Sequence, residues 1–510
     1  MLRLTGLLAL LTCVACGDDG SGGEDYTVVT VSNRLAVHDT TTLRVTLANS
    51  GAMRSDDIPL GSATLPATFS LTAPGRTGDL VITIDALDAQ GLLVGRGVTT
   101  TAVGSQTATV MLETADFVVN TEFADDQFPS TYSDTHGFQV GGTSDGSWAV
   151  TYRGTCPVTG CNIFARRFDS AGRPKTTQAA AGTAGFPVST NLTSGITTSA
   201  IASAGTTTIV AWNYDQPSPG TSVGVACRSL DAMGRAMPDE FLVSADTTTD
   251  NVSIAPLANN NFVLSWVGNS PRAVRGVVVR PDCMPVGAAP ITISTTPNPV
   301  SPAVAANGNT VMYGWMVDGN AYVRLASNTN TLQGAADVLF LPKTATDQIE
   351  FVRVAPLGQG FAVLVRWTLV GQFMGAGRIE MYRTNAAGAV LGPAVLISSR
   401  SGSDYGSSQA FGAATRMDGT MLVTWHACET TGDGQGCGVF ARAFHSDGSP
   451  LGEEFTVPTT TVGDQSNPSV TALGDSFAVV WKDDSMQAPD VAGSAVRARI
   501  VYPGAASGGN

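Results

Sequence analysis

Hydrophobic and polar residues alternate along short runs through much of the chain, and turn-forming residues separate these runs. Between residues 26 and 113 the alternation is clearest in YTVVTVS, TLRVTLA, ATFSLTA and DLVITIDAL. Alternation with a period of two residues is typical of half-buried antiparallel strands. About seven such strands in roughly 90 residues have the size of an immunoglobulin domain. The pattern therefore predicts an all-β chain that begins with a small immunoglobulin-like β-sandwich over residues 26–115.

After Asp116 a longer repeat begins, in which an apolar strand ending in an aromatic residue recurs seven times at intervals of 49 to 60 residues. The aromatic residues are Tyr152, Trp212, Trp266, Trp315, Trp367, Trp425 and Trp481. Each unit has the pattern of four short strands, which is typical of a β-propeller blade. The sequence predicts a seven-bladed propeller over residues 116–503 with these aromatic residues packed between blades; a ligand cage is the alternative use for them.

The sixth unit and the opening of the seventh carry the fullest copy of the repeat, GVFARAFHSDGSPLGEEFTVPTTTVGDQSNPSV, and the first unit contains NIFARRFDSAGRP. These segments resemble a repeat of large exported bacterial proteins, with the form VFARxFDxxGxPLGxEFxVNTxTxGDQ. The resemblance implies a propeller and no defined activity. The segment LPATFSLTAPGRTGDLVITIDALDAQGLLVGRG is similar to a domain at the N-terminus of exported bacterial lipoproteins.

The repeat also has a displaced copy. The segment DFVVNTEFADDQFPS at residues 116–130 nearly duplicates EFTVPTTTVGDQSNPS at residues 454–469, yet no repeat precedes it. The seventh unit ends near residue 503 without a counterpart of its outer strand. We expect residues 116–121 to supply that strand and to close the ring, which leaves no bare sheet edge at the junction.

The N-terminus begins with Arg3, an apolar run and small residues up to Cys16, which predicts a secretory signal peptide over residues 1–16. The stretch CVACGDD resembles the lipobox of bacterial lipoproteins, whose last cysteine is acylated. This resemblance implies lipidation at Cys16 and a lipid-anchored protein of the cell envelope, on the surface or periplasmic side of the outer membrane. Cleavage before Cys13 and an unlipidated export signal are the alternatives. Residues 17–25 read as a flexible tether and residues 504–510 as a disordered tail.

Six cysteines remain after lipidation at Cys16, and four of them form two pairs that flank equivalent loops. We expect disulfides within the pairs Cys156–Cys161 and Cys428–Cys437, which would bridge the two strands of a hairpin. Cys227 and Cys283 remain, and they could join adjacent blades. An exported chain with four His and no CxxC motif does not favour zinc binding.

The candidate chemistry is sparse. Only 14 % of the residues are charged and the net charge is −14, which disfavours nucleic acid as a partner. No metal, nucleophile or dinucleotide motif is present, so no cofactor is expected. The four histidines are His38, His136, His426 and His445, and His426 reads as a solvated loop residue. Carboxylates predicted in loops include Asp215, Asp318, Glu429, Asp433, Asp483 and Asp484.

The oxygen-rich stretch TGDGQG at residues 431–436 lacks an EF-hand frame, and weak calcium binding is one use for it. Uneven loops without catalytic motifs favour a non-enzymatic recognition or scaffold protein that binds a protein or a glycan. The alternative is an extracellular glycoside hydrolase with carboxylates at the mouth of the propeller channel.

Overall fold

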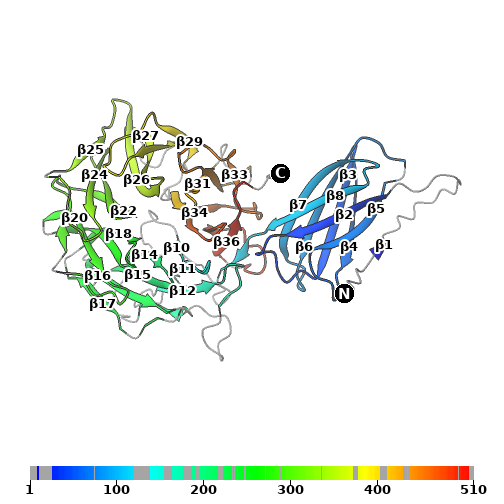
Figure 1. Cartoon of the computed structure of the whole chain (residues 1–510), viewed down its shortest axis with the longest axis horizontal. Coiled ribbons are helices and arrows are strands. Elements are labelled where there is room, and N and C mark those ends of the chain that lie inside the picture. Colours follow the sequence, from blue (N-terminus) through cyan, green and yellow to red (C-terminus); the bar gives the residue numbers. More distant parts are fainter. Residues whose placement is uncertain are drawn as a thin grey trace. The chain divides into compact units, whose positions relative to one another are not determined.

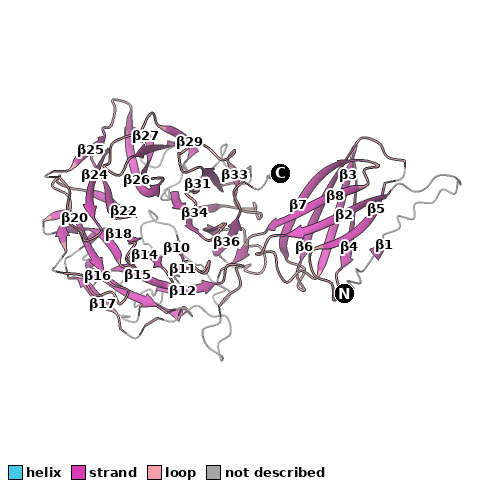
Figure 2. Ribbon diagram, in the orientation of Figure 1, coloured by secondary structure: helices cyan, strands magenta, loops and turns pink. Residues whose placement is uncertain are grey.

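The structure is a computed structural model, and it describes most of the chain outside the N-terminus and several loops. The described residues are 9–10, 26–73, 75–119, 138–153, 163–175, 186–189, 196–215, 222–231, 234, 236–237, 239–245, 248–269, 271–287, 290–334, 336–371, 377–401, 411–428, 433–434, 436–491 and 493–504. All regular elements assigned in these residues are β-strands (Figure 2). Accordingly, the described part contains no helix suited to crossing a membrane. The chain divides into two compact units. The first comprises Met1–Phe117 and Ala505–Asn510, and the second comprises Val118–Gly504.

The first unit contains one sheet with the strand order β1-β5-β2-β8-β7-β6-β3-β4. Its strands are β1 (Ala9–Leu10), β2 (Tyr26–Asn33), β3 (Thr42–Asn49), β4 (Ala52–Pro59), β5 (Ala67–Thr72), β6 (Asp79–Leu87), β7 (Leu93–Ala102) and β8 (Thr107–Thr114). Alternate residues point inward, as Val29 and Val31 do in β2 and Ile82 and Ile84 do in β6, all with 0 % exposure. The period of two in the sequence therefore becomes one buried face per strand.

The second unit is a propeller of seven blades, which confirms the all-β prediction and the blade count. The first three blades are β10 (Gln139–Gly142), β11 (Trp148–Arg153), β12 (Ile163–Phe168) and β13 (Phe186–Pro187); β14 (Ile196–Ala204), β15 (Thr207–Asp215), β16 (Ser222–Leu230) and β17 (Phe241–Ser244); and β18 (Thr248–Pro256), β19 (Phe262–Asn269), β20 (Arg272–Val279) and β21 (Ile291–Thr292). Blades 2 and 3 also share one pairing, Ser222 with Thr248.

The remaining blades repeat the same order. They are β22 (Val300–Asn307), β23 (Thr310–Val317), β24 (Asn320–Ser327) and β25 (Val338–Leu341); β26 (Asp347–Leu357), β27 (Gly360–Leu369), β28 (Gly377–Thr384) and β29 (Val395–Ser401); β30 (Phe411–Thr415), β31 (Met421–Ala427), β32 (Gly438–Phe444) and β33 (Phe455–Thr456); and β34 (Gln465–Ala472), β35 (Phe477–Asp483) and β36 (Ala495–Val501) with β9 (Phe117–Val118). The first strand of each blade is its inner strand, and Figure 1 shows these strands towards the middle of the ring.

The seven repeated aromatic residues are core residues. Tyr152 and the six tryptophans of the series are all buried, and the most exposed of them, Trp367, is only 5 % exposed. Trp212 of blade 2 belongs to a cluster with Ile163 and Ala165 of blade 1, so it fills the space between neighbouring blades. Burying an aromatic side chain of this size is a large contribution to stability. Packing between blades explains why these aromatic residues recur in the sequence, so a ligand cage is not needed to explain them.

The FDxxGxP part of the repeat forms the turn between the third and fourth strands. In blade 1, Asp169 Oδ1 accepts hydrogen bonds from the backbone N–H groups of Ala171 and Arg173, both at 2.9 Å. Asn385 in blade 5 makes the same pair of contacts, to Ala387 and Ala389 at 3.0 Å. Asp and Asn favour such turns because their short side chains reach the backbone two residues on. The motif is therefore structural.

In blades 1, 2, 4 and 7, an arginine at the FAR position of the third strand links the blade to the one before it, whereas Arg442 of blade 6 donates to Gly452 O of its own blade at 3.1 Å. A guanidinium Nη1 donates to a backbone carbonyl oxygen in the outer strand region of the preceding blade. The pairs are Arg228 to Val188 at 2.7 Å, Arg324 to Ile293 at 2.5 Å, Arg499 to Val457 at 2.7 Å and Arg166 to Val119 at 2.5 Å. In the last pair, the acceptor lies directly after β9, in a chain segment more than 300 residues before the rest of its blade.

Val119 matches its counterparts in backbone contacts as well. The Val119 N–H group donates to Val496 O at 2.7 Å, and the Val457 N–H group donates to Val439 O at 2.8 Å. β9 lies beside β36 in the order β34-β35-β36-β9. Val119 thus makes the same kind of backbone contact in the last blade that Val457 makes in blade 6.

Two disulfides are present in the described residues. Cys428 and Cys437 are nine residues apart and bridge the two strands of the blade 6 hairpin, as their spacing predicts. Cys227 lies in β16 of blade 2 and pairs with Cys283, which lies in the turn after β20 of blade 3. This second disulfide joins adjacent blades. Cys156, Cys161 and Cys16 lie outside the described residues.

Candidate functional site at the propeller channel

A cavity of about 380 Å³ lies among the inner strands of all seven blades. Each inner strand contacts the inner strand of the next blade, and β34 contacts β10 to complete the circle. Because every blade has the same antiparallel order, the inner strands run in the same direction along this channel. We call the end where they begin the channel mouth. Asp464 directly precedes β34 and lies four residues before Pro468, the first β34 residue of the lining.

The channel wall is built from small residues because the inner strands approach closely. A Cβ atom added to Gly142 of β10 would lie 2.3 Å from the Ala472 carbonyl oxygen of β34. Hydroxyl groups bond across the seams between blades. Thr471 Oγ1 accepts from the Gly142 N–H group at 2.8 Å, and Thr415 Oγ1 donates to Pro356 O at 2.6 Å.

Arg353 of β26 is the one charged side chain among the described residues that line the channel. Its Nη1 donates to the Val352 carbonyl oxygen at 3.1 Å. The guanidinium carbon lies 5.7 Å from the ring centre of Phe411, the first residue of the next inner strand, β30. This is a cation–π contact, and it orients the guanidinium group. Burial lowers the pKa of Arg353 to about 10, so the side chain is cationic at neutral pH.

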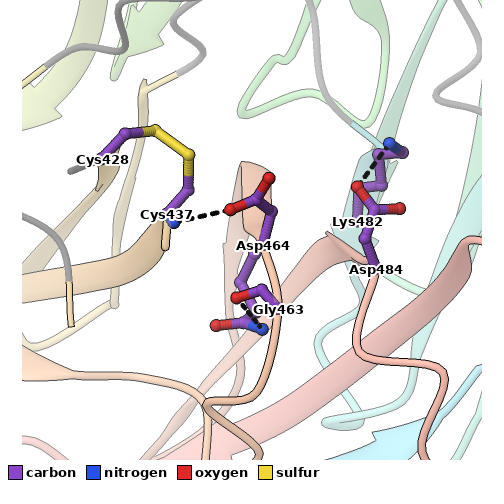
Figure 3. Close-up of a disulfide and its surroundings, with 7 residues drawn as sticks. Cys428, Cys437, Gly463, Asp464, Lys482 and Asp484 are labelled. Carbon is purple, nitrogen blue, oxygen red and sulfur yellow. Dashed lines mark hydrogen bonds and ion pairs between the residues drawn. A yellow bond between two sulfur atoms is a disulfide. The ribbon is translucent and has the colours of Figure 1, made fainter. Parts of the chain in front are cut away.

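Carboxylates gather where the loops of blades 6 and 7 meet at the mouth. Asp464 Oδ1 accepts a hydrogen bond from the Cys437 N–H group at 2.9 Å, and its backbone carbonyl accepts from the Asp484 N–H group at 2.8 Å. The Asp484 carboxylate accepts from Lys482 Nζ at 2.8 Å. Figure 3 shows Asp464 next to Cys437 of the Cys428–Cys437 disulfide, and Asp484 next to Lys482 on the other side of Asp464. The Asp464 side chain is exposed, and that of Asp484 is partly exposed.

The GDQ end of the repeat sets this geometry. Gly463 has a φ of +74°, and a Cβ atom there would lie 2.9 Å from the Asp484 carbonyl oxygen, so the loop requires glycine. Gln465 is fully buried, and its Nε2 donates to Val462 O at 3.0 Å and to Asp483 Oδ1 at 3.3 Å. The buried glutamine thus holds the loop in place, while the Asp464 side chain faces solvent.

A second Asp-Gln pair begins the inner strand of blade 5. Asp347 Oδ2 accepts from Arg378 Nη1 at 3.3 Å, and Arg378 Nε also donates to Glu380 Oε1 at 2.8 Å. The Arg378 guanidinium lies 5.2 Å from the centre of the Trp367 ring. Further carboxylates therefore lie at the same end of the ring as Asp464.

Two buried ion pairs support the mouth. Asp483 and Arg497 are 1 % and 3 % exposed at their side chains and lie 2.8 Å apart. Arg497 Nη2 also donates to Gln487 O at 2.7 Å, which ties down the loop after β35. Arg366 pairs with Glu350 in blade 5, and burial lowers the pKa of Arg366 to about 9. A buried pair adds little net stability but fixes positions, because breaking it leaves an uncompensated charge.

His426 departs from its expected place in a solvated loop. It lies within β31, is only 2 % exposed, and neither ring nitrogen has a hydrogen-bond partner in the described part of the protein. Burial and the charge of Arg366 lower the pKa of His426 to about 4, so the ring is neutral at physiological pH. The prediction failed because β31 continues two residues past Trp425.

The other predicted candidates do not form a site with these residues. His38 pairs with Asp39 in the first unit, His445 lies in the turn after β32, and His136 and Glu429 are outside the described residues. Asp318 lies in the turn between β23 and β24, and Asp215 ends β15. Of residues 431–436 only 433, 434 and 436 are described, and the described residues contain no group of three metal-ligating side chains placed for a metal ion.

Sequence reasoning missed Arg353, Asp347 and Asp464. The two aspartates carried a usable signal, because each precedes a Gln at the start of an inner strand, Asp347-Gln348 and Asp464-Gln465. Arg353 carried none, since an arginine in a strand of alternating residues looks like any solvent-facing position.

No protein-family model and no curated protein matches this chain. Solved structures similar to it include a Penicillium chrysogenum α-L-arabinanase in complex with arabinobiose, with 11 % identity, a TM-score of 0.41, and coverage of 76 % of this chain and 98 % of that one. A Streptococcus pneumoniae NanB sialidase has 8 % identity, a TM-score of 0.39, and coverage of 91 % and 89 %. Prolyl oligopeptidase B from Galerina marginata has 10 % identity, a TM-score of 0.41, and coverage of 68 % and 48 %.

These neighbours correct the prediction of a non-enzymatic recognition or scaffold protein, because all three are enzymes and two of them are glycosidases. The prediction relied on the lack of a recognisable catalytic motif. That lack is weak ground in a propeller, where functional groups come from loops of different blades and leave no contiguous motif.

Proposed function

We propose that the chain is a glycoside hydrolase that acts with carboxylates at the channel mouth. The observation that carries this proposal is the junction of blades 6 and 7, where Asp464 and Asp484 lie in hydrogen-bonded loops. The Asp464 side chain faces solvent, and buried Gln465 and the Asp483–Arg497 pair hold its surroundings. A catalytic group needs this kind of support to keep its position.

The chemistry needs two carboxyl groups on either side of a glycosidic bond. One donates a proton to the leaving oxygen, and the other activates a water molecule or attacks the anomeric carbon. Asp464 and Asp484 are the proposed pair, with Asp347 at the same end of the ring as a further carboxylate. The sugar-chain hydrolases named among the structural neighbours belong to this broad class, but support for the proposal comes from the site itself.

The test is a panel of polysaccharides assayed for release of reducing ends by the purified protein. Asp464→Asn and Asp484→Asn should each lower the rate about 10²- to 10⁴-fold, as expected when a general acid or base is lost. Asp475→Asn is the matched control, because Asp475 is also exposed but lies in the turn between β34 and β35 at the opposite end of blade 7. Full activity in both mouth variants would remove the proposal.

We further propose that the protein is exported and anchored through an acyl chain at Cys16. The support is the sequence of residues 1–25. Cells fed an alkyne-labelled fatty acid should label the wild-type protein and the Cys13→Ala variant, and Cys16→Ala should abolish the label. Labelling of Cys16→Ala at the wild-type level would reject this site.

We also infer that the first unit is an immunoglobulin-like sandwich and that β9 acts as the closing strand of the ring. Alternating burial in β2 and β6 supports the first inference. The contacts of Val119 with Val496 and Arg166 support the second. If β9 closes the ring, changes at Val119 should destabilise the propeller although the residue lies next to the first unit in sequence.

A further inference from the structure

The channel has a charge opposite to that of the protein. The chain carries a net charge of −14, yet the described residues that line the channel include one guanidinium group and no carboxylate. The uncharged lining residues are mostly small, such as Ala200, Ser469 and Gly141. A fixed cation within a low-dielectric wall attracts anions more strongly than the same cation on an open surface.

Arg353 is presented in a way that suits recognition. The side chain is half-buried, and the contact with the Phe411 ring at 5.7 Å holds the guanidinium plane. Arginine pairs with planar anions such as carboxylates through two parallel hydrogen bonds, and little entropy is lost when the group is already oriented. The cavity of about 380 Å³ is within the size range of pockets that bury small ligands.

The inner strands add a second kind of contact. Six of the seven inner strands stand first in their sheets and pair on one side only, as β10 does with β11 and β26 does with β27, while β18 also makes the single pairing of Thr248 with Ser222. The other edge therefore faces the channel axis, where backbone groups bond to hydroxyl groups, as the Gly142 N–H group does to Thr471 Oγ1 and the Pro356 carbonyl oxygen does to Thr415 Oγ1. The hydroxyl groups of a sugar are suited to the same kind of contact with the backbone of this edge. A ligand with hydroxyl groups and a carboxylate can bond to both kinds of group in the channel wall, the backbone of the inner strands and the Arg353 guanidinium.

We propose that the channel binds the carboxylate of an acidic sugar unit through Arg353, so that the substrates of the mouth carboxylates are uronate-containing glycans. This inference rests on the proposed hydrolase function only in calling the glycan a substrate. The anion site itself is inferred from the residues of the channel alone. Sugar units of the glycan would lie along the axis, with a uronate at Arg353 and a glycosidic bond at the mouth.

Binding is measured by titration calorimetry with three probes: a galacturonate tetramer, a neutral galactose tetramer and succinate. The tetramers are tested on the Asp464→Asn background so that they are not consumed. The acidic tetramer should bind at least ten times more tightly than the neutral one, and raising the salt concentration should reduce the difference. Succinate should bind more weakly than the acidic tetramer, because it lacks the sugar hydroxyls. Succinate binding as tightly as the tetramer would show a general carboxylate site and overturn the glycan assignment.

Arg353→Gln should abolish the preference for the acidic tetramer, and Arg353→Lys should keep part of it. Arg416→Gln is the matched control, because Arg416 also lies 5.7 Å from a phenylalanine ring, that of Phe477, but is not a lining residue. If Arg353→Gln fails to fold, the comparison in the Asp464→Asn protein with Arg353 intact still decides, since equal affinity for the acidic and neutral tetramers overturns the inference.

The two proposals fail separately. Preference for the acidic tetramer without cleavage of any glycan would remove the hydrolase and leave the anion site. Cleavage of glycans with no change of binding in Arg353→Gln would leave the hydrolase and remove the anion site.

Discussion

Replacing Val119 by alanine tests whether a segment next to the first unit in sequence is part of the last propeller blade. Val119 is fully buried, its N–H group bonds to Val496 O at 2.7 Å, and its carbonyl oxygen accepts from Arg166. The substitution keeps the backbone bonds and removes two methyl groups from a packed site. Lost transfer energy and the remaining cavity together should lower the free energy of unfolding by about 2–4 kcal/mol.

Val457→Ala is the matched control, because Val457 is also fully buried and occupies the equivalent place in blade 6. It donates to Val439 O at 2.8 Å and accepts from Arg499 at 2.7 Å. Tryptophan fluorescence in a urea titration is a selective assay, since all seven tryptophans lie between residues 148 and 481 and the first unit has none. The two variants should lose similar stability. A loss for Val119→Ala below a quarter of that for Val457→Ala would refute the closing role of this segment.

Three more predictions follow from single features of the fold. The pKa of His426 is about 4 in the folded state against an ordinary value of 6.5, so the unfolded state takes up the proton first as the pH falls. The free energy of unfolding should therefore fall by up to about 3 kcal/mol between pH 6.5 and pH 4. Denaturant titrations across this range should show a weaker pH dependence in His426→Phe. Gly142→Ala places a Cβ atom 2.3 Å from Ala472 O and should lower stability by about 1–3 kcal/mol, whereas Gly474→Ala, with nothing within 4 Å, should change it little in the same titration. Loss of the Cys227–Cys283 disulfide, which spans 56 residues, should lower stability by about 4 kcal/mol, and loss of Cys428–Cys437, which spans nine, by about 3 kcal/mol, with double serine variants compared by thermal melts.

The repeat made the propeller predictable because each blade buries its aromatic residue in the same way. Trp212 and Trp425 are core residues for one physical reason, and that reason recurs at a steady period in the sequence. The displaced copy at residues 116–130 carries the outer-strand pattern of the repeat, and its first strand, β9, stands next to β36 in the strand order.

The candidate site was less predictable because it depends on register and on contacts between blades. β26 has an irregular register between Ile349 and Phe351, and positions after such an irregularity cannot be assigned to a face by counting residues. Whether Arg353 faced the channel therefore could not be read from the alternation. Asp464 and Asp484 lie in separate loops, and only the fold shows that these loops share a hydrogen bond.

The glycosidase proposal is tested most directly by following the anomeric proton signals of a polysaccharide by NMR while the protein acts on it. The wild-type protein and Asp475→Asn should produce the signal of a newly formed reducing end at equal rates, and Asp464→Asn should produce it at least 100-fold more slowly. The same new signal at the wild-type rate with Asp464→Asn, or no new signal from the wild-type protein with any polysaccharide tested, would contradict the account.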